Sequence, residues 1–247
     1  SVKIHAMGNI YIGGYVEDAD IWSGQDIIIQ DGVNAGENGR IEAMGNISAR
    51  FFENAHIISH SDIKCDYMLN TTALAYGGIY LEGKRGSVIG GDVTGVRGIC
   101  IKACGSESYS KTVLRVGVTK EISSEYAKVL MVLKDIDTQI DRFNQALQKL
   151  DILKKAGSDK FDETLNRKLL QSKIVKTAEK AKYEEKSRNL YTLVRESDRA
   201  VVRIDKNIYP GSRVFMGDKT YVPSTVFTHI ALKKTSQGVL IRNYDSM

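Results

Sequence analysis

The sequence predicts a mainly β protein with an α insertion: a right-handed parallel β-helix, or β-solenoid, that carries a long antiparallel coiled-coil hairpin. Three observations predict it. Short strand patterns recur along the first half of the 247-residue chain, a heptad pattern follows them, and strand patterns return near the end. We therefore divide the chain into a solenoid over residues 1–120, a helical hairpin over residues 121–197, and a C-terminal β segment over residues 198–247 that completes or caps the solenoid.

The solenoid prediction depends on an internal repeat, in which a small turn signal precedes a β-branched residue. The spacings between these β-branched residues are 17, 20, 16, 16 and 14 positions. Apolar residues alternate with others after each signal, which is typical of short half-buried strands. Six similar units favour coils stacked on one another over the alternative, an antiparallel β-sandwich. The signals are Gly8-Asn9-Ile10, Gln25-Asp26-Ile27, Gly45-Asn46-Ile47, Ser61-Asp62-Ile63, Gly77-Gly78-Ile79 and Gly91-Asp92-Val93.

The same alternation predicts which side chains point into the solenoid. Their β-branching suits a stacked, half-buried surface, and the twist of parallel strands favours right-handed connections. The expected inward residues are Ile10, Ile12, Val16, Ile21, Ile27, Ile29, Val33, Ile41, Ile47, Ala55, Ile57, Ile63, Ala73, Ala75, Ile79, Leu81, Val88, Val93, Ile99 and Ile101.

The helical hairpin is predicted by a seam of apolar residues spaced alternately by four and three positions, a specific coiled-coil signal. We expect Gly157 to end this first helix and Ser158 or Asp159 to cap a second, which runs to about Ser197. A short break between two long helices indicates an antiparallel pair. The first seam is Ile122, Tyr126, Val129, Leu133, Ile136, Ile140, Phe143, Leu147 and Leu150. The second, poorer seam is Leu170, Ile174, Thr177, Ala181, Glu184, Arg188 and Tyr191.

Strand patterns return after the hairpin, separated by a turn at Pro210-Gly211. Because an antiparallel hairpin returns the chain to the point where it left, this segment can cover the exposed strand edges of the solenoid. The expected strands are Val201–Ile204, Arg213–Phe215, Thr220–Val222, Ile230–Leu232 and Val239–Ile241.

Net charge and the length of apolar runs argue against nucleic-acid binding and membrane insertion. The net charge of +5 is mild: residues 1–120 hold 11 basic and 13 acidic side chains, residues 121–197 hold 16 and 13, and residues 198–247 hold 8 and 4. A nucleic-acid surface is usually a denser basic face with aromatic partners, so nucleic-acid binding through the hairpin and tail is a minor alternative. No apolar run approaches the ~20 residues of a membrane helix, and we expect no membrane insertion.

Cysteine and histidine usage points to no metal, cofactor or disulfide. Cys65, Cys100 and Cys104 form no CxxC pair, which favours a reducing cytoplasm and cysteines that pack as small apolar side chains. His56 and His60 lie in a strand pattern, where residues four apart are separated by about 13 Å, too far to share one metal ion.

Many β-helices are carbohydrate-active enzymes, and this class is the main alternative function. Such enzymes need at least two carboxylates about 5–10 Å apart in a groove. The only acidic run in the solenoid is Glu17, Asp18 and Asp20, at a predicted corner, where solvation of a turn is the simpler interpretation. We therefore predict no enzymatic activity.

Several motifs together carry a resemblance to a known family. They are Arg50-Phe51-Phe52-Glu53-Asn54-Ala55, Gly83-Lys84-Arg85-Gly86-Ser87-Val88-Ile89-Gly90-Gly91, Gly105-Ser106 before Thr112-Val113-Leu114-Arg115-Val116-Gly117, and Ile208-Tyr209-Pro210-Gly211 with Arg213-Val214. With these motifs and the coiled-coil insertion, nearly the whole chain resembles the flagellar assembly protein A family. The solenoid is also similar to bactofilins, bacterial cytoskeletal β-helices that polymerise end to end. The stretch from Cys104 to Thr112 departs from the proline-containing pattern of the family.

The resemblance implies a right-handed β-helix with a helical hairpin and a cytoplasmic role in flagellar assembly or polar positioning through protein partners. It supplies no catalytic residues. The family normally has a further N-terminal region, and this chain begins almost inside its repeat, so we expect a piece of a longer protein.

Two surfaces are candidates for protein partners. The first is a charged ridge of Arg50, Glu53, Lys84 and Arg85, for which the alternative is a surface ion pair between Arg50 and Glu53 that contributes little. The second is the hairpin, because its first helix has a richer seam than the second and leaves apolar surface for another chain. A dimer of hairpins that forms a four-helix bundle would cover that surface, and we expect a homo-oligomer.

Overall fold

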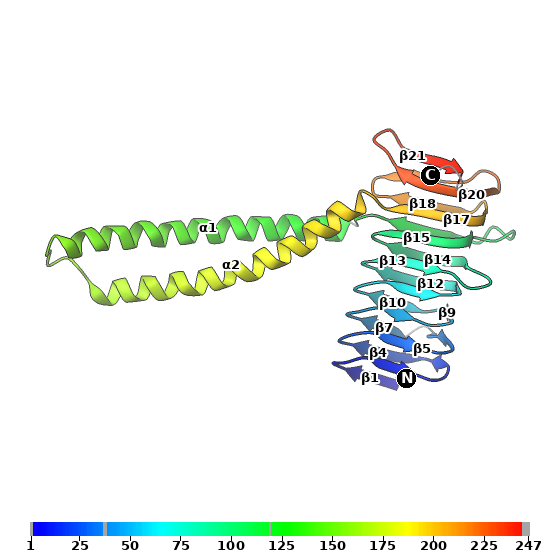
Figure 1. Cartoon of the computed structure of the whole chain (residues 1–247), viewed down its shortest axis with the longest axis horizontal. Coiled ribbons are helices and arrows are strands. Elements are labelled where there is room, and N and C mark those ends of the chain that lie inside the picture. Colours follow the sequence, from blue (N-terminus) through cyan, green and yellow to red (C-terminus); the bar gives the residue numbers. More distant parts are fainter. Residues whose placement is uncertain (1, 37–38, 119, 244–247) are drawn as a thin grey trace. The chain divides into compact units, whose positions relative to one another are not determined.

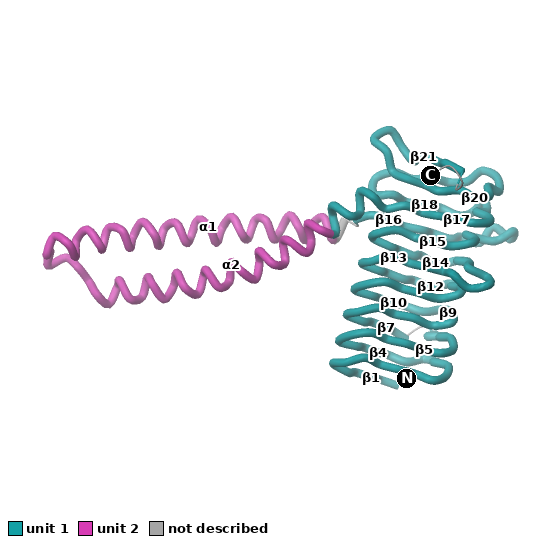
Figure 2. The backbone as a smooth tube through the Cα atoms, viewed as in Figure 1, with its two compact units in different colours: residues 1–119, 193–247 teal, residues 120–192 magenta. Residues whose placement is uncertain are grey.

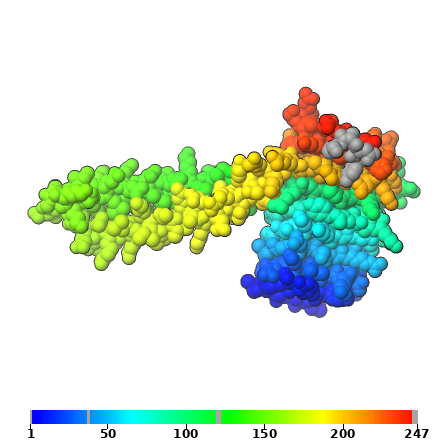
Figure 3. Space-filling model, in the orientation of Figure 1, coloured from blue at the N-terminus to red at the C-terminus, as the bar shows by residue number. Residues whose placement is uncertain are grey.

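The computed structural model describes residues 2–36, 39–118 and 120–243. It divides into two compact units, residues 1–119 with 193–247 and residues 120–192 (Figure 2). The first unit is a three-sided parallel β-solenoid whose coils follow the sequence from the N-terminal strands upward (Figures 1 and 3). The second unit is a pair of helices, α1 (Lys120–Lys155) and α2 (Glu163–Ser197), of which α2 ends in the first unit.

Each face of the solenoid is a ladder of strands in which every strand pairs in parallel with the equivalent strand of the next coil. The first face holds β1 (Val2–Ala6), β4 (Ala19–Ser23), β7 (Arg40–Ala43), β10 (His56–Ser59), the second halves of β12 (Tyr67–Ala75) and β14 (Ser87–Gly95), β16 (Thr112–Val116) and β18 (Ser212–Met216).

The second and third faces are built in the same way. The second face holds β2 (Ile10–Ile12), β5 (Ile27–Ile29), β8 (Ile47–Ser48), β11 (Ile63–Cys65), β13 (Gly78–Leu81) and the first halves of β15 (Gly98–Cys104) and β17 (Val201–Ile208). The third face holds β3 (Val16–Glu17), β6 (Gly32–Asn34), β9 (Phe51–Glu53), the first halves of β12 and β14, and the ends of β15 and β17.

The interior of the solenoid is a column of aliphatic side chains, stacked one coil above another. On the second face Ile10, Ile27, Ile47, Ile63, Ile79, Ile99 and Val202 follow in register and all are buried. Each such side chain contributes roughly 1.5–3 kcal/mol of burial. Of the predicted inward residues, only Ile12 is partly exposed, and it still packs against the core. The parallel solenoid is thus confirmed, and its right-handed sense stays a prediction.

The sixth repeat signal was placed wrongly. Val93 pairs with Ala73 on the first face, and the residue that continues the column above Ile79 is Ile99, so the spacing is 20 positions rather than 14. A longer connection between β13 and β14 lengthens this coil and delays the next corner to Arg97-Gly98.

Side-chain oxygens connect successive coils at the corner between the first and second faces. The amide of Asp26 donates to Asn9 Oδ1 at 3.0 Å, the amide of Asn46 to Asp26 Oδ1 at 2.6 Å, the amide of Asp62 to Asn46 Oδ1 at 3.2 Å, and the amide of Gly78 to Asp62 Oδ1 at 2.8 Å. Asn and Asp accept such bonds readily in turns. The polar residues of the repeat signals therefore hold the coils in register.

The hairpin is inserted at this same corner, between β16 and β17. In the preceding coil the corresponding corner, between Gly95 and Gly98, consists of Val96 and Arg97 alone. After the insertion β17 and β18 continue the parallel ladders, and the chain then reverses: β19 (Lys219–Tyr221), β20 (Phe227–Lys234) and β21 (Val239–Asn243) pair antiparallel. The predicted C-terminal strands are confirmed, and they both complete the last coil and cover its edge.

The tip of the hairpin differs from the prediction at its second cap. Gly157 has φ of +63° and ends α1 as expected, with the amide of Ser158 bonded to the Leu153 carbonyl at 3.1 Å. The second helix is capped by Asp162, whose carboxylate accepts from the amide of Leu165 at 3.0 Å, so the predicted caps Ser158 and Asp159 were wrong.

Candidate interaction surfaces

A stack of aromatic rings runs along the outside of the third face. Phe51 and Tyr67, which are paired across adjacent coils, have ring centroids 5.1 Å apart and an interplanar angle of 11°. Tyr15 lies 6.2 Å from Phe51 on the other side. Between them Gly32 leaves room, since a Cβ atom there would be 2.1 Å from the Phe51 ring. Phe51 and Tyr67 thus cover one ring face of each other, whereas Tyr15 at the end of the stack is 49% exposed.

Two of the four residues of the predicted ridge, Glu53 and Arg85, contact this stack. Glu53 accepts a hydrogen bond from the Tyr67 hydroxyl at 2.8 Å, and the Arg85 guanidinium lies 4.4 Å from the centre of the Tyr67 ring. Burial and the bond to Glu53 raise the pKa of Tyr67 above its ordinary value. Arg50 and Lys84 are exposed. The Glu53 carboxylate therefore bonds to Tyr67 instead of forming the ion pair with Arg50 that the alternative required.

The glycine-rich loop around Lys84 is anchored to both neighbouring coils. The Asp66 carboxylate accepts from the amides of Arg85 at 2.8 Å and Gly86 at 3.1 Å, and the Lys102 amine donates to the Gly83 carbonyl at 2.7 Å. Gly86 has φ of +57°, a conformation that glycine adopts at little cost. The loop thus presents the Lys84 side chain from a fixed backbone.

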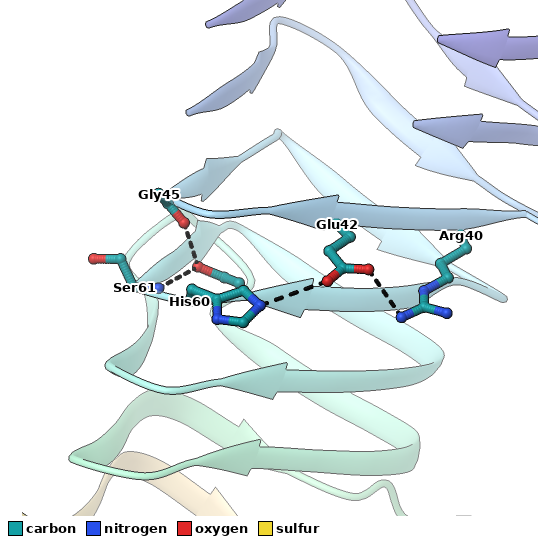
Figure 4. A network of polar contacts seen from close by, with 6 residues as sticks. Arg40, Glu42, Gly45, His60 and Ser61 are labelled. Atoms are coloured by element: carbon teal, nitrogen blue, oxygen red, sulfur yellow. Dashed lines mark hydrogen bonds and ion pairs between the residues drawn. The ribbon is translucent and has the colours of Figure 1, made fainter. Parts of the chain in front are cut away.

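A second polar network lies on the first face (Figure 4). Arg40 donates to Glu42 at 2.9 Å, His60 Nε2 lies 3.5 Å from the other Glu42 oxygen, and the His60 ring stacks on Tyr76 with centroids 4.9 Å apart. His56, the first residue of β10, is exposed. Within the described residues no group of three or more histidine, cysteine or acidic side chains is placed to hold a metal ion.

Two clefts in the described part of the chain lack the pair of carboxylates that a carbohydrate-active site requires. One, of about 470 Å³, lies on the first face, and the other, of about 760 Å³, lies between α1 and α2. The first is lined by Gly39, Arg40, His56, Ile57, Ile58, Thr72 and Leu74; the second by Ser124, Glu125, Lys128, Val129, Val132, Tyr183 and Lys186. Neither of these two linings contains a pair of carboxylates, and Glu17, Asp18 and Asp20 belong to neither.

The cysteines pack as the sequence indicated. Cys65 and Cys104 are buried, Cys100 is half-buried, and all three are free thiols. Burial raises the pKa of Cys65 far above its ordinary value and that of Cys104 to about 12. A thiol with a raised pKa stays protonated at neutral pH and is a poor nucleophile.

The residues predicted for the seam of α1 are all at least partly shielded from solvent. Four of its residues are buried and the other five are half-buried, with none fully exposed. The buried ones are Ile122, Val129, Ile136 and Leu150, and the half-buried ones are Tyr126, Leu133, Ile140, Phe143 and Leu147. A strict alternation of four and three is therefore sufficient to identify the buried face of this helix.

The seam predicted for α2 was wrong by one residue. Every predicted member is exposed, and the buried or half-buried face consists of the residue before each of them. The observed seam is Leu169, Lys173, Lys176, Lys180, Tyr183, Ser187 and Leu190. Its three lysines are half-buried, and long cationic side chains can pack their aliphatic stems while the amines stay in water. Because lysine is not apolar, an apolar pattern did not reveal this seam.

Two ion pairs connect the helices. Lys180 lies 2.7 Å from Asp137 and Lys186 lies 2.6 Å from Glu125. The hydrogen bond to each carboxylate, with its charge, raises the pKa of each of the two lysines. In both pairs a later residue of α2 meets an earlier residue of α1, as in an antiparallel hairpin.

The one-residue shift leaves apolar side chains of α2 in solvent. Leu170 is 44% exposed, Ile174 68% and Tyr191 51%, and on α1 Met131 is 73% exposed. Leu170, Ile174, Thr177 and Ala181 recur at heptad spacing along the tip half of α2, and we call them the outer stripe. An exposed apolar stripe on a helix is typical of an interaction surface.

The described part of the chain contains no helix long and apolar enough to cross a membrane. A family model described as the flagellar assembly protein A beta solenoid domain matches residues 1–237. No curated protein and no solved structure matches the chain. The similarity to bactofilins stays a prediction. Since the match spans the stacked coils, the inserted hairpin and most of the C-terminal strands, the chain belongs to the flagellar assembly protein A family.

Proposed function

We propose that this chain is a non-enzymatic scaffold of the bacterial cytoplasm, which acts in flagellar assembly or polar positioning through self-association and protein docking. The observation that carries the proposal is the outer stripe of α2, which leaves apolar side chains exposed at heptad spacing. Association with another helix would remove this surface from water, at roughly 25 cal/mol per Å² of apolar area. The family supports the link to flagellar assembly.

The architecture supports a different role for each of the two units. The solenoid is held by continuous backbone ladders and a single aliphatic core, and the hairpin is added at one corner without interrupting the ladders. In this proposal the solenoid is the rigid support and the hairpin is the element of association. The exposed heads of Arg50 and Lys84, on an anchored loop and corner, are proposed to dock a second protein, with Glu53 and Arg85 holding that surface together.

The test is the mass in solution, measured by light scattering over a range of concentrations. We expect the whole chain to form a discrete dimer and a variant with Ile122–Ser197 replaced by a short linker to be a monomer. If both were monomers at high concentration, self-association through the hairpin would be refuted. If both were dimers, association would belong to the solenoid.

A further inference from the structure

The charges of the hairpin are segregated along its length. We call the loop at residues 156–162 the tip and the opposite end, near Ile122 and Thr192, the base. The tip half of α2, residues 163–182, holds six basic and two acidic side chains, whereas the base half of α1, residues 122–141, holds four acidic and two basic ones. The two halves are therefore opposite in sign, and they lie at different heights of the same hairpin.

Exposed apolar side chains lie in the same two halves. On the tip half of α2, Leu170 and Ile174 are exposed four residues apart. On the base half of α1, Ala127 and Met131 are exposed with the same spacing. Residues four apart lie on one face of a helix, so each half presents a short apolar ridge that its own hairpin does not cover.

The charges of the two halves favour one contact between the apolar ridges of two copies over the other. Two α2 ridges packed against each other would bring together two strongly basic segments, and like charges that face each other are unfavourable. An α2 ridge packed on an α1 ridge of a second copy joins opposite charges. Because α1 runs from base to tip and α2 returns, two hairpins laid tip to base and wound around each other as in a coiled coil bring the tip half of α2 in one copy to the base half of α1 in the other, and a two-fold axis across the hairpins repeats the contact at the other end.

We infer that the partner of the outer stripe is the base half of α1 in a second copy of this chain, in a tip-to-base dimer of hairpins. This inference rests on the proposed self-association and specifies its geometry. The two neighbouring helices run in the same direction, so setting Ile174 against Met131 also sets Leu170 against Ala127. The acidic base half of each α1 thus binds the basic tip half of α2 in the other copy.

Disulfide cross-linking tests this geometry in the full-length chain. In a Cys100→Ser background, where the remaining Cys65 and Cys104 are buried, one tagged chain carries Met131→Cys and a second, differently tagged chain carries Ile174→Cys. Under mild oxidation we expect the mixture to form the mixed disulfide, whereas Ile174→Cys alone forms few linked pairs. A chain with Ile152→Cys, equally exposed at the tip end of α1, is the matched control and is expected not to link to Ile174→Cys.

The outcomes separate this inference from the proposed function. Efficient linking of Ile174→Cys to itself would indicate a parallel, tip-to-tip dimer and would overturn the inference while leaving self-association intact. A chain that is monomeric by light scattering would refute both. As a second measurement, Ile174→Asp is expected to raise the dissociation constant of the dimer about tenfold or more, and Ile152→Asp to leave it within about twofold; equal effects would also overturn the tip-to-base geometry.

Discussion

At the scale of single residues, stability depends on close fits between successive coils. The amide of Gly78 donates to the Asp62 carboxylate at the corner, and the preceding Gly77 lies so near that a Cβ atom would be 2.1 Å from this carboxylate and 2.7 Å from the Ser61 carbonyl oxygen. The carbonyl belongs to the backbone and cannot rotate away. A glycine in the repeat signal is thus required for packing between coils.

We predict that Gly77→Ala lowers the free energy of unfolding of the solenoid by about 1–3 kcal/mol, because an overpacked site must displace its neighbours. The measurement is thermal unfolding followed by the circular dichroism of the β structure. Gly14→Ala is the matched control, since no atom lies within 4 Å of a Cβ built there. Equal melting temperatures for the two variants would show that the corner can relax around the added methyl group.

At the scale of elements, the hairpin pairs an apolar helix with a mostly polar one. The seam of α1 is made of apolar side chains, whereas that of α2 contains three half-buried lysines, of which Lys180 bonds to Asp137 on α1. The contribution of such exposed ion pairs is small. We therefore attribute most of the stability of the hairpin to the aliphatic residues of α1 and their few apolar partners.

We predict that Ile136→Ala destabilises the hairpin by about 2 kcal/mol or more, because Ile136 is only 2% exposed and its removal leaves a cavity. Ile152→Ala, at a position 67% exposed on the same helix, is expected to change the stability by less than about 0.5 kcal/mol. Helical circular dichroism during urea unfolding measures both. A similar loss in the two variants would contradict the assignment of the buried face.

At the scale of the whole molecule, the hairpin takes the place of a short corner. The coil before it turns from the first face to the second with Val96 and Arg97 alone. The strands on either side of the insertion, β16 and β17, each pair with their own neighbours in the preceding coil. The ladders on either side of the insertion are therefore continuous with the coil below.

We predict that the variant with Ile122–Ser197 replaced by a short linker keeps the β circular dichroism signal and melts within a few degrees of the solenoid of the whole chain. It loses the ion pair between Arg97 and Glu196, at 2.6 Å, but both side chains are about half exposed and such a pair contributes little. Loss of the β signal or of cooperative unfolding in this variant would mean that the helices are needed for folding of the solenoid.

The sequence by itself determined the parallel solenoid, its aliphatic interior and the buried face of α1. Each of these depends on a pattern of residue types with a regular period, and burial of apolar surface follows such a period directly. The turn residues of the repeat, among them Asn9, Asp26 and Asn46, were visible as turn signals, although their role as acceptors for the next coil depends on how the coils stack.

Only the tertiary structure decided the features that depend on coil length and on partners from another element. The lengthened coil before Ile99 displaced the sixth repeat, and Tyr67 stacks on Phe51 because one coil separates them. The face of α2 that packs depends on the side chains of α1 that it meets. Three lysines are therefore half-buried in the seam of α2, whereas Ile174 is exposed to solvent. Local pattern cannot predict such choices, because the free energy of a lysine stem or an isoleucine depends on the surface it meets.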